Sequence, residues 1–184
     1  IGICGGYQML GRAIYDPYHT ESKHGQIEGM DLLPMETTFS KHKLTSQVNA
    51  DCEEMVFLGS KIQARNLHGY EIHMGKTTVS TGEHQTPLVQ LADGRTDGVQ
   101  RMEKGSEAPG VYGSYVHGIF DDGDIAVRIV QALAEKKGVS WKPEAGGDYH
   151  AFKEQQYDKL AQGLREHLDM EYVYSILQES RISS

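Results

Sequence analysis

The sequence predicts an α/β fold, and three stretches carry that prediction. Residues 1–14 read as a strand, a sharp turn and a helix, residues 68–79 alternate between polar and apolar side chains, and residues 125–137 show helical spacing of apolar side chains. The 184 residues include 21 glycines and 38% hydrophobic side chains, which suits a single soluble α/β domain with many tight turns.

The first stretch, IGICGGYQML, carries the strongest signal. β-Branched residues lead into Cys4, two glycines follow, and a helical pattern opens with Tyr7, Leu10, Ala13 and Ile14. This order is typical of a nucleophile elbow, so we expect a strained backbone at Cys4 and a helix N-terminus whose N–H groups favour a thiolate. These residues alone leave a structural thiol equally open, because a buried cysteine usually acts as a small hydrophobe.

The next segments carry weaker signals. Residues 18–28 are polar and predict a surface loop, and residues 32–39 predict a strand that Pro34 pushes towards a sheet edge. Residues 51–54 (DCEE) predict a charged turn, in which Cys52 would have no chemical role.

The alternation in residues 68–79 (HGYEIHMGKTTV) predicts a strand with two different faces. The apolar face is expected to be buried and holds Tyr70, Ile72 and Met74. The polar face holds Glu71 and His73. Periodicity alone favours a polar face in water, and the alternative is a polar wall that faces a cleft.

The second half continues the α/β pattern. Residues 88–91 predict a short strand, and Asp97-Gly98 predicts a turn. Residues 111–120 predict an aromatic-rich strand that ends at His117, beside the small Gly118.

A helix is expected over residues 125–137, with Gly138 as its C-cap. Residues 138–150 predict a linker, and an amphipathic helix or helix pair follows. We therefore expect a core over residues 1–138 and an extension over residues 139–184 that packs on that core.

Charge and composition exclude several classes of function. A net charge of −8 argues against binding to nucleic acid or to an anionic membrane, and neither an apolar run of membrane-spanning length nor a signal peptide is visible. The two cysteines predict neither a disulfide framework nor a metal pair, and a free thiol suits the cytoplasm. No metal site is expected, because His68 and His73 fall on opposite faces of a strand.

Several motifs resemble a known family. Residues 2–11 (GICGGYQMLG) resemble the nucleophile motif of class I glutamine amidotransferases. Residues 69–75 (GYEIHMG) and 115–121 (YVHGIFD) narrow the resemblance to the cobyrinic acid amidating subgroup, and residues 154–161 and 168–170 resemble the C-terminal end of the cobyric acid synthase family. The match runs from residue 1 almost to the C-terminus.

The resemblance implies a truncated, flavodoxin-like class I amidotransferase domain with a mixed sheet and a C-terminal helical segment. It implies hydrolysis of glutamine and delivery of ammonia to an ATP-dependent synthetase domain, which amidates corrinoid side-chain carboxylates in cobalamin biosynthesis. That domain precedes the glutaminase domain in the family, and ATP and Mg²⁺ are expected there, with no cofactor in the glutaminase domain. Because the chain begins inside a strand, the synthetase domain and the first part of the glutaminase domain are expected to be absent, and the fragment weak or inactive.

The resemblance also implies roles for single residues. Cys4 would attack the side-chain amide of glutamine, with His117 as its proton partner. The substrate-binding residues would be Gly5, Gly6 and Gln8, of which Gly5 would donate its N–H to the oxyanion and Gln8 would contact glutamine. Tyr70, Glu71 and His73 match a subgroup motif and are possible cleft residues without an assigned role.

One departure from the wider class concerns His117. Many class I amidotransferases carry His-Pro-Glu, whose glutamate orients the histidine, whereas this sequence has His117-Gly118-Ile119. His117 must therefore be oriented by another group or by packing.

The sequence leaves two alternatives open. The related a,c-diamide synthase shares the chemistry but modifies other carboxylates. The chain could instead be a non-catalytic docking module, and a catalytic site would require the Cys4 and His117 side chains within a few ångströms of each other.

Overall fold

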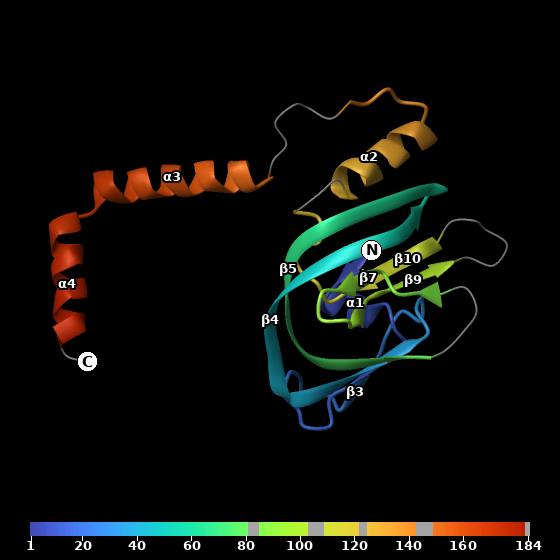
Figure 1. Cartoon of the computed structure of the whole chain (residues 1–184). Helices are drawn as coiled ribbons and strands as arrows, with labels where there is room; N and C mark the ends of the chain where they lie inside the picture. Colours follow the sequence, from blue (N-terminus) through green and yellow to red (C-terminus); the bar gives the residue numbers. More distant parts are fainter. Residues whose placement is uncertain (81–84, 103–108, 122–124, 143–148, 183–184) are drawn as a thin grey trace. The chain divides into compact units, whose positions relative to one another are not determined.

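The fold is α/β, with mixed sheets and helices at the C-terminal end, as the sequence predicts (Figure 1). It is consistent with the flavodoxin-like arrangement that the resemblance implies. The chain forms two compact units, residues 1–142 and residues 143–184. The computed structural model describes residues 1–80, 85–102, 109–121, 125–142 and 149–182.

A four-stranded sheet carries the elbow in the described part of the first unit. Its strands, in spatial order, are β1 (Gly2–Ile3), β10 (Pro109–Ser114), β9 (Val99–Met102) and β6 (Gln85–Thr86). Strand β1 runs parallel to β10, and the other pairs are antiparallel. Helix α1 (Gly5–Met9) begins one residue after Cys4 and so starts at the end of β1.

The second sheet, again within the described residues, is built around a long hairpin. Its main path runs through β3 (Gln26–Glu28), β2 (Ala13–Tyr15), β4 (Met35–Phe57), β7 (Val89–Leu91) and β8 (Thr96–Asp97), and β5 (Ser60–Val79) pairs with β4. Strand β2 is parallel to β4, while β5 and β7 are antiparallel to it. Figure 1 shows β4 and β5 as a long, strongly curved ribbon pair.

The hairpin corrects the prediction of a turn at residues 51–54. Strand β4 continues through this segment, where Cys52 is 1% exposed and faces Ala64 of β5. Register shifts on both sides of Cys52 absorb extra residues as bulges, so the strand bends without ending. The chain turns at Leu58 and Gly59, both with positive φ (51° and 84°).

Two further predictions are wrong in detail. Ala13 and Ile14 lie in β2 and not in the elbow helix, because α1 ends at Met9 and the chain turns at Gly11. A Cβ at Gly11 would lie 2.7 Å from the Met35 carbonyl oxygen, so glycine permits this close approach. Residues 26–28 of the predicted surface loop form the exposed strand β3.

The predicted strand 111–120 and turn 97–98 also differ from the structure. Strand β10 ends at Ser114, so His117 lies beyond it and makes an isolated bridge with Tyr70. Asp97 ends β8 and is buried, and Gly98 joins β8 directly to β9 with a φ of 73°.

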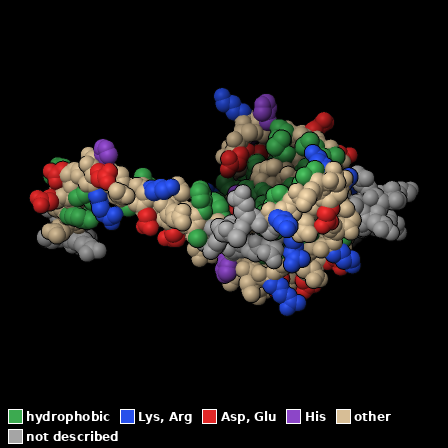
Figure 2. Space-filling model, turned by 90° about the horizontal axis from the view of Figure 1, so that it is seen from above, with side chains coloured by type: hydrophobic (Ala, Val, Ile, Leu, Met, Phe, Trp, Pro, Cys, Tyr) green, Lys and Arg blue, Asp and Glu red, His purple; other side chains and the backbone are tan. Residues whose placement is uncertain are grey.

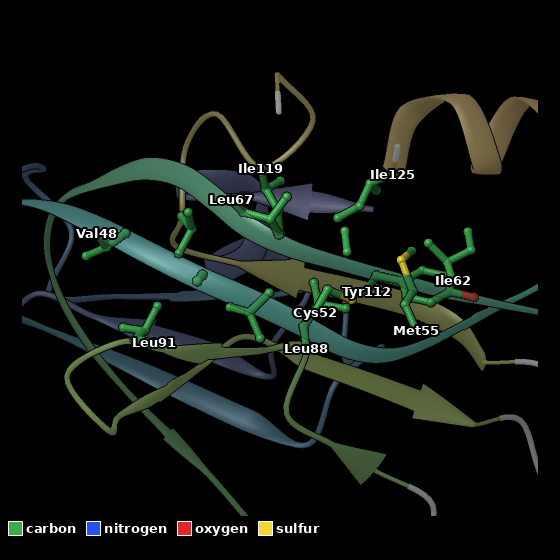
Figure 3. Packing of buried hydrophobic residues seen from close by; sticks show 14 residues of the cluster. Val48, Cys52, Met55, Ile62, Leu67, Leu88, Leu91, Tyr112, Ile119 and Ile125 are labelled. Carbon is green, nitrogen blue, oxygen red and sulfur yellow. The ribbon is translucent and has the colours of Figure 1, made fainter. Parts of the chain in front are cut away.

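The main hydrophobic core lies between the hairpin, β7, β10 and helix α2 (Ile125–Lys136) (Figure 3). It is formed by side chains such as Ile62, Leu67, Leu91, Val116 and Ile125. Burying each such aliphatic side chain contributes about 1.5–3 kcal/mol. A second cluster, with Tyr7, Leu10, Leu33, Met35, Val99 and Tyr115, lies at the elbow.

The helices of the C-terminal half form where the sequence predicts them. Gly138 (φ 65°) follows α2, and α3 (Tyr149–His167) and α4 (Met170–Ile182) make the predicted helix pair. Apolar side chains of α3 and α4, including Leu160 (61% exposed), lie on the surface of their own unit, as the green side chains in Figure 2 show. The packing of this extension on the core stays a prediction.

Candidate active site

Cys4 has the strained geometry that the sequence predicts. It lies between β1 and α1 with φ 53° and ψ −111°, in a region that costs a residue with a side chain roughly 1–3 kcal/mol. Two backbone bonds hold it, from Cys4 N–H to the Ser114 carbonyl (2.9 Å) and from Gln8 N–H to the Cys4 carbonyl (3.0 Å). Gly2 is required nearby, because a Cβ there would lie 2.6 Å from the Gly6 carbonyl oxygen.

The two thiols have different surroundings. The Cys4 thiol is partly exposed and points to the Ile72 carbonyl of β5, with 3.6 Å between sulfur and oxygen. Cys52 is 1% exposed, and burial raises the pKa of its thiol to about 11. Cys52 is therefore a core residue, and Cys4 is the candidate nucleophile.

His117 contacts the same segment of β5 as Cys4. His117 N–H donates to the Tyr70 carbonyl (2.9 Å), and Tyr70 N–H donates to the His117 carbonyl (3.2 Å). The two rings stack with centroids 4.9 Å apart and planes within 2°. Tyr70 and Ile72 are two residues apart, roughly 7 Å along a strand, so β5 brings the surroundings of Cys4 and His117 together.

The predicted substrate-binding residues differ in their exposure to solvent. Gly5 and Gly6 are exposed in the first turn of α1, where N–H groups have no partner within the helix. Gln8 is buried, and its side-chain amide donates to the Tyr115 hydroxyl (3.2 Å). The predicted contacts of these three residues with glutamine stay predictions.

The burial predicted for the strand 68–79 is wrong. Tyr70 is 45% exposed, whereas Glu71 is only 2% exposed. The reason is a charge partner, since Arg95 places its two terminal nitrogens 2.9 and 3.4 Å from the Glu71 carboxylate oxygens. A paired carboxylate can be buried where an unpaired one would lose its hydration without compensation.

Sequence reasoning missed Arg95. It lies just after the turn residues Asp93 and Gly94, and its Nε also donates to the Asp93 carboxylate (2.8 Å). No motif marks this arginine. The only signal for it is the Asp93-Gly94 turn just before it, which can direct the Arg95 side chain back over the polar face of β5.

His73 lies beside Glu71 in this polar region. Its Nδ1 is 2.7 Å from the Gly75 carbonyl oxygen, which can only accept, so Nδ1 carries a proton. The His73 ring stacks on Tyr115 with centroids 3.7 Å apart. Within the described residues its buried Nε2 has no hydrogen-bond partner and lies 3.9 Å from the Glu71 carboxylate.

Asp97 is a second buried carboxylate that sequence reasoning did not select. One of its oxygens accepts from the Ser114 hydroxyl (2.5 Å) and the Tyr115 N–H (2.9 Å). Burial raises the pKa of the Asp97 carboxyl, and these hydrogen bonds offset only part of the rise. Because the Ser114 carbonyl holds Cys4 N–H, Asp97 supports the turn that positions the elbow.

The raised pKa of Asp97 gives a prediction about stability. The native protein binds this proton more tightly than the unfolded chain, so its free energy of unfolding should fall as pH rises from the ordinary pKa of 3.8 through the higher native value. Asp97→Asn keeps an acceptor oxygen but loses the titrating proton. Urea unfolding at several pH values should show the variant gaining stability relative to wild type as pH rises, and a difference that is independent of pH would contradict this.

A cavity of about 670 Å³ lies beside this polar region. Its walls include Glu71, His73, Arg95, Asp97 and Tyr115. The polar face of β5 therefore faces a cleft, which was the alternative to a polar face in water. Cys4 and His117 do not line this cavity, so the elbow geometry, and not the cavity, identifies the candidate catalytic centre.

Neither a cluster of metal-binding side chains nor a membrane-spanning helix is found among the described residues. No group of three or more His, Cys, Asp or Glu side chains in these residues is arranged to hold a metal ion. None of the helices in the described ranges combines the length and the apolar character needed to cross a membrane.

Residues 1–125 match the family described as "CobB/CobQ-like glutamine amidotransferase domain". Similar curated proteins include the cobyric acid synthase of Lachnoclostridium phytofermentans, which is 37% identical over 182 residues, 97% of this chain and 35% of the relative. The cobyric acid synthases of Alkaliphilus metalliredigens and Clostridium botulinum (strain 657 / Type Ba4) are 38% and 41% identical, each over 96% of this chain and 35% and 34% of their own lengths. The chain thus spans about a third of the curated relatives that it matches.

Proposed function

Because the chain belongs to the CobB/CobQ-like glutamine amidotransferase family, we propose that it hydrolyses glutamine to glutamate and ammonia at Cys4. The observation that carries this proposal is the strained backbone of Cys4 (φ 53°) on a turn between β1 and α1. Such a turn presents a nucleophile at the end of a strand, with the N–H groups of the following helix beside it.

In the proposed reaction, Cys4 Sγ attacks the side-chain amide carbon of glutamine and forms a tetrahedral oxyanion. The Gly5 N–H donates to this oxyanion, and Gln8 contacts the substrate. A proton from His117 allows ammonia to leave, and a thioester of Cys4 remains. Water then attacks the thioester with His117 as general base, which releases glutamate and regenerates the thiol.

The ammonia is proposed to pass to an ATP-dependent synthetase domain that amidates corrinoid side-chain carboxylates in cobalamin biosynthesis. The threefold greater length of the cobyric acid synthase relatives supports a separate N-terminal domain of this kind. ATP and Mg²⁺ would act in that domain, and no residue of this chain is assigned to them. The names of these relatives favour cobyric acid synthase over the a,c-diamide synthase.

A glutamine analogue with an electrophilic ketone in place of the amide tests this proposal. Mass spectrometry of the intact protein should find one equivalent of analogue on Cys4, and an excess of glutamine should slow the labelling. Cys52 should stay unlabelled, because it is 1% exposed and burial raises its thiol pKa to about 11.

The matched controls are Cys4→Ser and Cys52→Ala. The first should prevent labelling, and the second should leave it unchanged. Labelling that glutamine does not slow, or that falls on Cys52, would favour the non-catalytic docking module instead.

A further inference from the structure

We propose that Tyr70 positions His117 for proton transfer, and so replaces the glutamate that orients this histidine in many class I amidotransferases. The inference rests on the proposed function of His117 as the proton partner of Cys4. In the described part of the chain, no carboxylate forms a hydrogen bond or an ion pair with the His117 ring. The question is therefore what fixes this ring.

The backbone of His117 is fixed by Tyr70. The two residues exchange both backbone hydrogen bonds, at 2.9 and 3.2 Å, although His117 lies outside any regular strand. Gly69 makes this approach possible, because a Cβ at Gly69 would lie 2.4 Å from the His117 carbonyl oxygen. Gly118 follows with a φ of 81°, so the chain can turn away immediately after the bridge.

The ring of His117 is fixed by the ring of Tyr70. The planes are 2° apart with centroids separated by 4.9 Å, so the tyrosine covers one face of the imidazole. Imidazole nitrogens donate and accept in the ring plane, so this stacking orients the ring without using either nitrogen. The tyrosine face also stabilises a positive charge on the imidazole, which forms whenever His117 holds the transferred proton.

Strand β5 links this support to the nucleophile. The Ile72 carbonyl contacts the Cys4 thiol, and Ile72 lies two residues after Tyr70 on the same face of the strand. One short segment therefore sets both the position of the thiol and the orientation of its proton partner. Tyr70 is 45% exposed, so its removal does not empty the core.

Steady-state glutamine hydrolysis by the intact protein tests the proposal. Tyr70→Leu should lower kcat on the order of 10- to 100-fold, with KM for glutamine unchanged within about twofold, because a misplaced general base slows the chemistry without removing substrate contacts. Tyr70→Phe keeps the aromatic face and should retain wild-type kcat. Tyr18→Leu, at another exposed tyrosine, is the matched control and should also leave kcat unchanged.

The ring protons of His117 give a readout that does not depend on activity. In NMR spectra, assigned with a His117→Gln variant, stacking should shift these protons upfield in wild type and in Tyr70→Phe. The shift should vanish in Tyr70→Leu.

Three results would overturn the role of Tyr70: an unchanged kcat in Tyr70→Leu, ring-proton shifts that persist in that variant, or an equal loss of activity with glutamine and with ammonium as donor. If Tyr70→Leu is active but His117→Ala is not, the proposed function stands and only this inference fails. If His117→Ala itself is harmless, the proposed function of His117 fails.

Discussion

Replacing Cys4 with alanine is expected to abolish amidation with glutamine and to leave amidation with ammonium salts intact. Without the thiol no thioester can form, and losses after removal of a nucleophile typically exceed about 10⁴-fold. The proposed synthetase domain needs ammonia but is indifferent to its source. The assay compares the two nitrogen donors for each variant of the intact protein, at saturating ATP and Mg²⁺.

Two variants sharpen this result. Cys4→Ser keeps the size of the side chain and should lose the same activity, because a serine hydroxyl is a far weaker nucleophile at neutral pH. Cys52→Ala should keep both activities if the protein stays folded, since Cys52 belongs to the hydrophobic core. An equal loss with both donors in Cys4→Ala would mean that Cys4 supports the fold or the coupling of domains.

The elbow could be predicted from the sequence because the signals that mark it lie within a few residues. The strand, the turn and the helix are contiguous, and the glycine at position 2 is required by the carbonyl of Gly6, four residues away. The positive φ of Cys4 follows from that order. The length of the elbow helix could not be predicted, because a distant contact of Gly11 with Met35 sets where the chain turns.

The polar face of β5 shows what periodicity cannot predict. Alternation sorts residues by side-chain type, so it placed Glu71 in water and Tyr70 in the core. The structure reverses both, and Glu71 can be buried because Arg95, 24 residues later, pairs with it. Such long-range pairing is invisible to a pattern that spans a dozen residues.

The same limit explains the missed hairpin. The charged run at residues 51–54 resembles a turn, yet alternate side chains such as Ala50 and Cys52 are buried against neighbouring strands. Bulges allow the strand to pass through a segment whose local composition disfavours it. The real turn does carry a signal, because Gly59 suits a positive φ.

Replacing His117 with alanine is expected to separate the two donors in the same way as replacing Cys4. A general acid–base group typically contributes ~10²–10⁴-fold, because without it the amine nitrogen receives no proton and is a much poorer leaving group, and water must attack the thioester unaided. Glutamate release should fall by that factor, while ammonium-dependent amidation should persist.

The matched control for His117→Ala is His24→Ala, at an exposed histidine in the loop between β2 and β3. It should keep both activities. A loss of glutamate release below tenfold in His117→Ala would contradict the assigned role. A larger loss, together with the retained activity of Tyr70→Phe, would mean that a histidine oriented by an aromatic ring can act as the general acid–base group, as a histidine oriented by a carboxylate does. The physical requirement is then a fixed ring orientation, which stacking on Tyr70 and the paired backbone bonds already supply.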